Sequence, residues 1–159
     1  MEEIKIHRLC PNEIDAGFLI VVEYYNSLGV TARESPAVFA QEYFGPDSGF
    51  WLASIQDKVA GCIALRRLPA QAIPSAELKR MYVRPNFRSR GVGEALLRAA
   101  QSYARACNYA ELYLDTMSTM VGAARLYERN GFQRCGRYNN NPQAAIFMKK
   151  NLNLAAAQY

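Results

Sequence analysis

One segment of the sequence, from Ala76 to Gly93 (AELKRMYVRPNFRSRGVG), constrains the fold and the function more than any other. It reads as an extended run, a turn marked by Pro85 and a basic loop spaced by glycines. The loop leads directly into an amphipathic helix, whose apolar residues recur three or four positions apart at Val92, Ala95, Leu96, Ala99, Ala100, Tyr103 and Cys107. The segment therefore predicts a strand, a glycine-rich turn and a helix in succession.

The loop between this strand and this helix has the features of an anion site. The first backbone N–H groups of a helix have no internal acceptor, and the helix dipole adds partial positive charge there. Gly91 and Gly93 let a ligand approach the main chain closely, because they carry no Cβ. Arg88 and Arg90 add full positive charges beside those amides. We therefore expect the loop to hold a phosphate group.

Spacing separates three families of phosphate-binding loops. A Walker loop requires Lys and then Ser or Thr after its last glycine, and Gly93 is followed instead by Glu94-Ala95. A dinucleotide fingerprint requires a third glycine where Leu96 stands, although Asp115 lies about where a ribose-binding acid belongs, so this alternative stays open. The third pattern, R/Q-x-x-G-x-G/A after a V-x-P turn, is present without a gap over Val83–Gly93.

The composition is that of one globular domain. The 159 residues suit a single domain of about 100–200 residues, half of them are apolar, and no apolar run approaches the roughly 18 residues that span a bilayer. The first residues, MEEIKIHRLC, lack the basic-then-apolar plan of a signal peptide. We expect a soluble, cytoplasmic protein with no membrane partner, one domain over residues 1–150 and a tail over residues 151–159.

Cysteine spacing and charge distribution argue against two further function classes. The four cysteines (Cys10, Cys62, Cys107, Cys135) are widely spaced and His7 is the single histidine, so we expect no metal site. The net charge of +5 is dispersed along the chain without a basic stripe interleaved with aromatic residues, so we expect no nucleic-acid partner. Part of this charge is better explained as steering for a polyanionic cofactor.

The apolar pattern predicts the element order β-α-α-β-β-β-α-β-α-β-β. The strand, helix and strand around the basic loop imply a right-handed crossover and a parallel pair. The expected strands cover residues 4–9, 50–56, 58–68, 75–83, 111–116, 132–138 and 144–149. The expected helices cover residues 11–27, 35–44, 92–108 and about 120–130.

Two motifs carry a resemblance to a known family. Arg88–Gly93, after Val83-Arg84-Pro85, resembles the acetyl-CoA pyrophosphate loop of the GNAT superfamily of N-acetyltransferases. Ala123–Phe132 (AARLYERNGF) resembles the A-x-x-L-Y-e-x-x-G-F signature of the last helix of that family. The element order is also typical of the GNAT fold, so the resemblance covers nearly the whole domain. It implies an α+β (α/β/α-like) fold with a mixed central sheet of about six to seven strands whose central strands splay apart.

The resemblance implies an acetyl-CoA-dependent N-acetyltransferase without a metal, which transfers acetyl to a primary amine by direct attack in a ternary complex. The cofactor-binding residues that it implies are Met81, Tyr82, Val83, Arg88, Ser89, Arg90, Gly91, Val92, Gly93, Glu94, Ser118, Ala123 and Tyr127. The chain departs from the family at Met120, where many relatives carry a cofactor-contacting asparagine. Ser118 or Thr119 is the substitute that we expect for this contact.

Acetyl transfer makes three chemical demands: the amine must lose a proton, the oxyanion needs a donor, and the departing thiolate needs a proton. Tyr127 is by resemblance the general acid, since a phenol is still protonated at pH 7 and can protonate sulfur. A hydrogen-bonded core tyrosine is the alternative. The main-chain N–H of Met81 is by resemblance the oxyanion donor, on a strand whose mixed polarity suits a bulge or an edge position.

Glu77 is the candidate general base, acting directly or through water. It lies on the same strand, six residues before Val83, where many relatives carry a catalytic glutamate. The alternative is a solvated or ion-paired carboxylate, with Arg66, Arg67 or Lys79 as its partner.

The acceptor amine is the least constrained part of the prediction. By resemblance, residues 24–35 and 138–142 line the acceptor groove. Side chains there and nearby that can bind a carboxylate favour a small amino acid or metabolite, and they are Arg33, Arg67, Arg137 and Asn139–Asn141. Ordinary solvated loop residues are the alternative explanation.

Two other functions stay open. A protein N-terminus or lysine is the nearest alternative acceptor, and a catalytically silent acyl-CoA-binding sensor is the alternative from another function class. The presence of both Glu77 and Tyr127 argues against the sensor. The edges of the last strands permit a homodimer without requiring one.

Overall fold

The computed structural model describes residues 2–30, 34–69 and 71–153. Its centre is a mixed sheet of seven strands in the order β1-β2-β3-β4-β5-β7-β6, in which β4 and β5 are parallel and the other pairs antiparallel. The strands are β1 (Ile4–Arg8), β2 (Gly49–Ile55), β3 (Lys58–Arg67), β4 (Ser75–Val83), β5 (Glu111–Thr116), β6 (Gln133–Arg134) and β7 (Ile146–Asn151). The predicted order and class of fold are confirmed.

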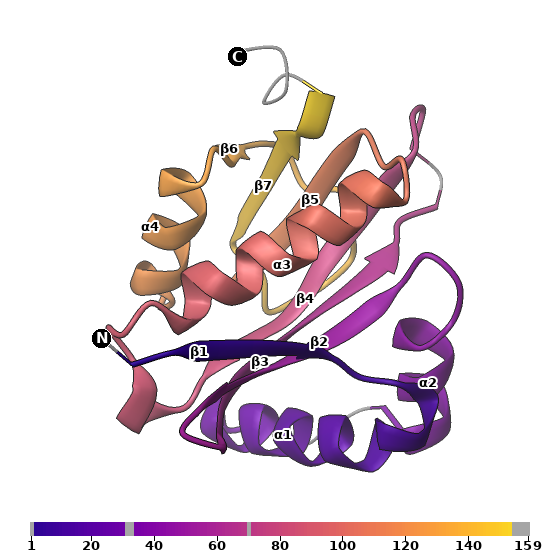
Figure 1. Ribbon diagram of the computed structural model, residues 1–159. Helices are drawn as coiled ribbons and strands as arrows, with labels where there is room; N and C mark the ends of the chain where they lie inside the picture. The colour runs from indigo at the N-terminus through magenta and orange to yellow at the C-terminus, as the bar shows by residue number, and fades with distance from the viewer. Residues whose placement is uncertain (1, 31–33, 70, 154–159) are drawn as a thin grey trace.

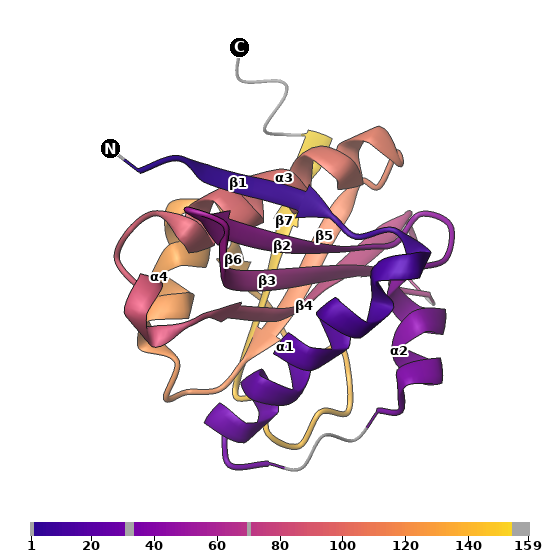
Figure 2. The same ribbon diagram turned by 60° about the horizontal axis from the view of Figure 1, so that its bottom comes forward.

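Helices cover both faces of this sheet. Figure 1 shows α3 (Val92–Ala106) crossing one face with α4 (Val121–Arg129) beside its first turn, and Figure 2 shows α1 (Ile14–Ser27) and α2 (Pro36–Tyr43) on the opposite face. The apolar stripe of α3 buries Leu96, Leu97, Ala100 and Ala104 against the sheet. Within the part of the chain that the structure describes, no helix has the length and apolar character needed to cross a membrane.

The carboxyl-terminal elements differ from the prediction. The strand expected at residues 132–138 is reduced to β6, because the Arg137 guanidinium donates to the carbonyl oxygens of Asn139, Asn141 and Ala144 and holds these residues in a loop. Strand β7 begins later than expected and continues to Asn151, and Leu152 is buried in the core. Core residues therefore continue past residue 150, the bounds of the domain and the tail stay predictions, and residues 154–159 of the expected tail lie outside the described residues.

Strand β4 contains a bulge near its middle. Ala64 of β3 pairs with Lys79 and Cys62 pairs with Tyr82, so two residues of β4, Arg80 and Met81, face one residue of β3. Arg80 has a positive φ of 57°, a conformation that non-glycine residues adopt only rarely. The irregularity that the mixed polarity of this strand predicted is thus present.

The bulge coincides with a gap between the two central parallel strands. Strands β4 and β5 pair only over Ser75–Glu77 and Glu111–Tyr113. Beyond Glu77, the β5-facing main-chain groups of β4 therefore have no partner on β5. The central strands splay apart here, as the resemblance implied.

A substitution at Gly61 tests how closely β3 approaches β4. A Cβ at this position would lie 2.4 Å from the carbonyl oxygen of Tyr82, in a main chain that cannot shift without disturbing the bulge. We expect Gly61→Ala to lower the free energy of unfolding by about 1–3 kcal/mol, measured by urea denaturation. In the control Gly122→Ala in α4, the added Cβ meets no atom within 4 Å, so stability should be unchanged or rise by up to about 1 kcal/mol. Equal stabilities of the two variants would contradict this close approach.

Candidate active site

The basic loop after β4 presents main-chain N–H groups at the start of α3. A 3-10 turn over Pro85–Phe87 is followed by Ser89 and Gly91, both at positive φ, and α3 begins at Val92. The N–H of Ala95 is the first to donate within the helix, to Gly91 O at 3.1 Å. The N–H groups before it have no acceptor in the helix and can bind an anion.

A cavity of about 520 Å³, which we call the loop cavity, lies beside these N–H groups. Most of the predicted cofactor-binding residues line it, namely Met81, Tyr82, Val83, Arg88, Ser89, Gly91, Val92, Gly93, Glu94 and Ala123. Thr119, one of the two expected substitutes for the missing asparagine, also lines it. So do six residues that were not predicted to bind the cofactor, namely Phe87, Met120, Val121, Gly122, Leu126 and Arg129. Four of these six residues belong to α4, and Met120 directly precedes it.

Three of the predicted cofactor-binding residues are not on the wall of the loop cavity: Arg90, Ser118 and Tyr127, which lines the second cavity described below. Arg90 forms an ion pair with Glu2 and donates to Asn86 O at 3.2 Å. Ser118 is exposed, and its neighbour Thr119 lines the cavity instead. Their contacts with a cofactor stay predictions.

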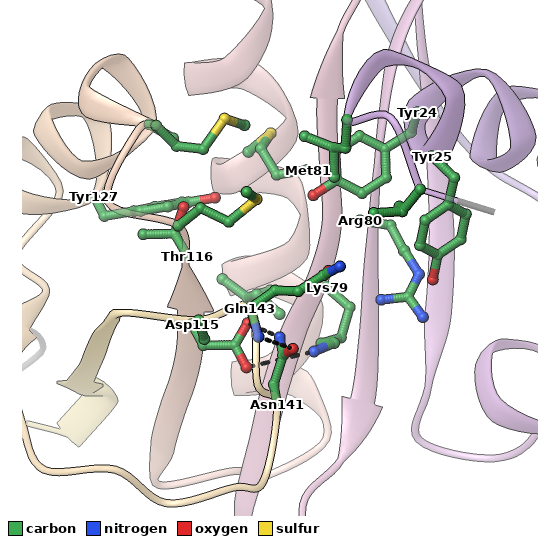
Figure 3. Close-up of a pocket in the computed structure, with 17 residues that line it drawn as sticks. Tyr24, Tyr25, Lys79, Arg80, Met81, Asp115, Thr116, Tyr127, Asn141 and Gln143 are labelled. Atoms are coloured by element: carbon green, nitrogen blue, oxygen red, sulfur yellow. Dashed lines mark hydrogen bonds and ion pairs between the residues drawn. The ribbon is translucent and has the colours of Figure 1, made fainter. Parts of the chain in front are cut away.

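A second cavity of about 250 Å³ lies between α1, β4, β5 and the loop before β7, and we call it the charged cavity. Figure 3 shows its labelled side chains converging from these elements. Its wall includes Tyr24, Tyr25, Leu28, Val30, Lys79, Arg80, Met81, Asp115, Thr116, Met120, Ala123, Tyr127, Asn141 and Gln143. Met81, Met120 and Ala123 line both cavities, so the two meet where β4 and β5 have separated.

Tyr127 lies at this junction. Its ring packs edge-on against Phe132, and its hydroxyl points into the charged cavity, facing the hydroxyl of Tyr24 (Figure 3). Burial raises the pKa of Tyr127, and burial also raises the pKa of Tyr24 to about 12, so both phenols are protonated at neutral pH.

Glu77 does not reach the wall of either cavity. Its side chain is 1% exposed, and Oε1 accepts from Arg66 Nε at 3.0 Å. Oε2 accepts from the Tyr138 hydroxyl at 2.7 Å and from Asn139 Nδ2 at 3.1 Å. Burial, with Glu77 next in importance, raises the pKa of Tyr138, so this hydroxyl remains a donor. The structure thus contains the ion pair with Arg66 that was the alternative for Glu77, and a role as base stays a prediction.

Asp115, Lys79 and the asparagines of the loop before β7 form a cluster that sequence reasoning missed. The Asp115 carboxylate accepts from Asn139 Nδ2 and from Asn141 Nδ2, the latter at 3.4 Å. Lys79 Nζ lies 3.6 Å from Asp115 Oδ2 and 3.8 Å from Glu77 Oε2, so it links the two carboxylates. Residues so distant in sequence give no shared local pattern, and only the tertiary fold brings them together.

Some of the residues predicted to line an acceptor groove line the charged cavity, and their role stays a prediction. Tyr24 and Tyr25 of α1 and Asn141 line the charged cavity, whereas Arg67 is exposed at the end of β3 and Arg137 binds loop carbonyls. Arg33 lies outside the described residues. In the described part of the chain, no group of three or more His, Cys, Asp or Glu side chains is arranged to hold a metal ion.

Comparison with known proteins identifies the relatives of this chain. The acetyltransferase (GNAT) family model matches residues 18–132. An uncharacterised N-acetyltransferase of Schizosaccharomyces pombe is 28% identical over 138 residues, which cover 83% of each chain. The N-acetylaspartate synthetase of Xenopus tropicalis is 32% identical over 127 residues, which cover 75% of this chain and 46% of that protein, so this chain spans about half the length of that relative.

Solved structures agree with this at the level of the fold. An acetyltransferase of the GNAT family from Staphylococcus aureus Mu50 superimposes with a TM-score of 0.79 at 21% identity, covering 94% of this chain and 99% of that one.

Removing the Glu77 carboxylate should destabilise the fold. Glu77→Ala leaves Arg66, Tyr138 and Asn139 without their shared acceptor in a buried site, so we expect a loss of about 2–4 kcal/mol in the free energy of unfolding. Glu42 pairs with the same Arg66 at 2.9 Å but is 30% exposed, so Glu42→Ala is the matched control and should cost less than about 1 kcal/mol. Denaturant unfolding of both variants measures the difference, and similar losses would contradict a structural role for Glu77.

Proposed function

The chain belongs to the acetyltransferase (GNAT) family and is an acyltransferase, and we propose that it transfers acetyl from acetyl-CoA to the primary amine of a small metabolite or amino acid. Members of this family generally use acetyl-CoA as co-substrate. The observation that carries the proposal is the junction of the two cavities at Met81, Met120 and Ala123, with the Tyr127 hydroxyl facing it. An acyl donor in one cavity and an amine in the other would meet at that point.

In this proposal the loop cavity holds the CoA part of the donor. The N–H groups at the start of α3 and the Arg88 guanidinium bind the pyrophosphate. The splayed β4 strand lies along the pantetheine arm at Met81–Val83. The thioester then reaches the junction, where the main-chain N–H of Met81 donates to the developing oxyanion.

The amine attacks the thioester directly. After one ammonium proton has left to solvent, the nitrogen lone pair forms the N–C bond and the C–S bond breaks. Tyr127 gives its hydroxyl proton to the departing sulfur and regains a proton from the acetylated nitrogen. None of Cys10, Cys62, Cys107 and Cys135 lines either cavity, which supports direct attack over an acyl-cysteine intermediate.

Because Glu77 is buried, its proposed effect on the amine is indirect. Lys79 lies between Glu77 and Asp115, and Asp115 lines the charged cavity. Glu77 therefore influences loss of the amine proton through these neighbours and through Asn139, which donates to both carboxylates.

The size and charge of the second cavity favour a small acceptor. Its volume of about 250 Å³ and the three charged side chains that line it among the described residues suit a compact polar molecule. The similarity to a protein named N-acetylaspartate synthetase supports the same class of acceptor. A protein N-terminus or lysine is the second candidate, and a non-catalytic acyl-CoA sensor the third. A cytoplasmic location and a homodimer stay predictions.

A panel of amines separates these functions. We expect thiol release from acetyl-CoA to be stimulated by small amines or free amino acids, and much less by peptides. Preference for peptides would support the protein acceptor. Tight binding of acetyl-CoA without turnover on any amine would contradict the proposed activity and favour the sensor.

Tyr127→Phe tests the proposed acid. The variant keeps the ring that packs on Phe132 but has no proton to give, so we expect kcat to fall about 100-fold with little change in acetyl-CoA affinity. Steady-state kinetics and calorimetric titration measure the two quantities. The control Tyr103→Phe removes a hydroxyl from α3, away from both cavities, and should leave kcat unchanged. An unchanged kcat in Tyr127→Phe would remove the assigned role.

A further inference from the structure

Three charged side chains line the charged cavity within the described residues: Lys79, Arg80 and Asp115. Figure 3 shows Asp115 beside Asn141 and Lys79 on the β5 side, and Arg80 on the opposite side beside Tyr25. Both a carboxylate and a guanidinium thus face one small space. A single ligand with two opposite charges would satisfy both.

The bulge is what places these charges together. In a regular strand successive side chains point to opposite faces, so Lys79, Arg80 and Met81 could not all line one cavity. They do so because Arg80 adopts a positive φ of 57°, which costs roughly 1–2 kcal/mol for a non-glycine residue. The charged side chain of Arg80 is also only 15% exposed. Strain and a buried charge at one residue point to a functional role for that side chain.

The guanidinium of Arg80 has capacity for a ligand. Its Nε donates to Glu34 Oε1 at 3.2 Å, and its remaining N–H donors form a planar fork that matches a carboxylate. Burial alone lowers the pKa of Arg80, but nearby Tyr43 and Glu34 raise it above the usual value, so the group is charged. The ring of Tyr25 lies 5.2 Å from the guanidinium carbon and holds it on the cavity wall.

The Asp115 carboxylate can accept further hydrogen bonds from a positively charged group of the same ligand. It accepts one close hydrogen bond from Asn139, but its contacts with Asn141 at 3.4 Å and with Lys79 at 3.6 Å are long, and a carboxylate accepts up to about four hydrogen bonds. It lies one residue before Thr116, which is on the same cavity wall beside Tyr127 (Figure 3). An ammonium group on Asp115 would therefore lie near the junction where acetyl transfer takes place.

We propose that the acceptor is a free amino acid bound as its zwitterion, with its ammonium group on Asp115 and its carboxylate on Arg80. This inference rests on the proposed function and names the acceptor class of that site. The positive charge of Lys79 is shared between Asp115 and Glu77, and that of Arg80 is paired with Glu34.

The same geometry discriminates against related amines. A peptide N-terminus or an amino acid amide has no carboxylate, so Arg80 keeps its ion pair with Glu34 but its other N–H donors gain no charged acceptor. A site built around a polar partner rejects analogues that lack it far more strongly than an apolar pocket rejects a missing methylene. Free amino acids should therefore be preferred over their amides.

The test compares each proteinogenic amino acid with its own carboxamide at saturating acetyl-CoA. For the best amino acid we expect kcat/KM to exceed that of the amide about tenfold or more, which is the contribution of one charge-assisted contact. Arg80→Gln should remove this preference by raising KM for the amino acid alone, and Arg80→Lys should restore part of it. Asp115→Asn should lower kcat/KM for the amino acid and the amide alike. Arg98→Gln, the same change on the exposed face of α3, should leave the preference intact.

Direct binding separates failure of this inference from failure of the proposed function. Calorimetry measures binding of the same amino acid to the CoA-saturated protein and needs no turnover. Binding to wild type that Arg80→Gln weakens about tenfold or more supports the inference even where no amine is acetylated. Equal kcat/KM for amino acid and amide in wild type, or an unchanged preference in folded Arg80→Gln, overturns it while leaving the acetyltransferase activity standing. If thermal unfolding shows that Arg80→Gln does not fold, the inference is decided by the wild-type protein alone, from the ratio of kcat/KM for the amino acid to kcat/KM for its amide.

Discussion

The extra residue in β4 is the constraint on which the rest of the site depends. It sets Arg80 at a positive φ and shifts the register between β3 and β4, and β4 leaves β5 after Glu77. A regular strand would continue the parallel ladder and close the sheet at this point. Because the ladder stops, the loop cavity and the charged cavity meet at Met81, and a group from each side can reach the same space.

Buried charged side chains are concentrated around the same strand. Glu77 anchors Arg66, Tyr138 and Asn139, and through Asn139 and Lys79 it is linked to Asp115 on the cavity wall. Such a network is costly to bury unless each charge has a partner, so its members fix one another's positions. The loop before β7 is thereby held against the splayed strands, and it completes the cavity in which the amine is proposed to bind.

Local patterns were sufficient to predict much of this architecture. The element order and the glycine-rich loop follow from residues adjacent in sequence, and a motif within one helix singled out Tyr127, which lines a cavity and whose role as acid stays a prediction. The cluster of Asp115, Lys79 and Asn139 could not be predicted, because its members lie on separate segments that only the tertiary fold brings together. The shortening of the strand after Phe132 depends on hydrogen bonds from Arg137 to main-chain carbonyls across a loop. The spacing of apolar residues in the sequence carries no information about such bonds.

The central claim is that acetyl transfer occurs between the splayed strands, at Met81. The most direct test is a crystal structure with a ketone analogue of acetyl-CoA, in which a methylene between sulfur and carbonyl prevents transfer. The analogue's carbonyl oxygen should lie about 2.7–3.1 Å from the Met81 nitrogen, with its sulfur beside the Tyr127 hydroxyl. An acyl end that lies outside the junction, away from both Met81 and Tyr127, would contradict the account.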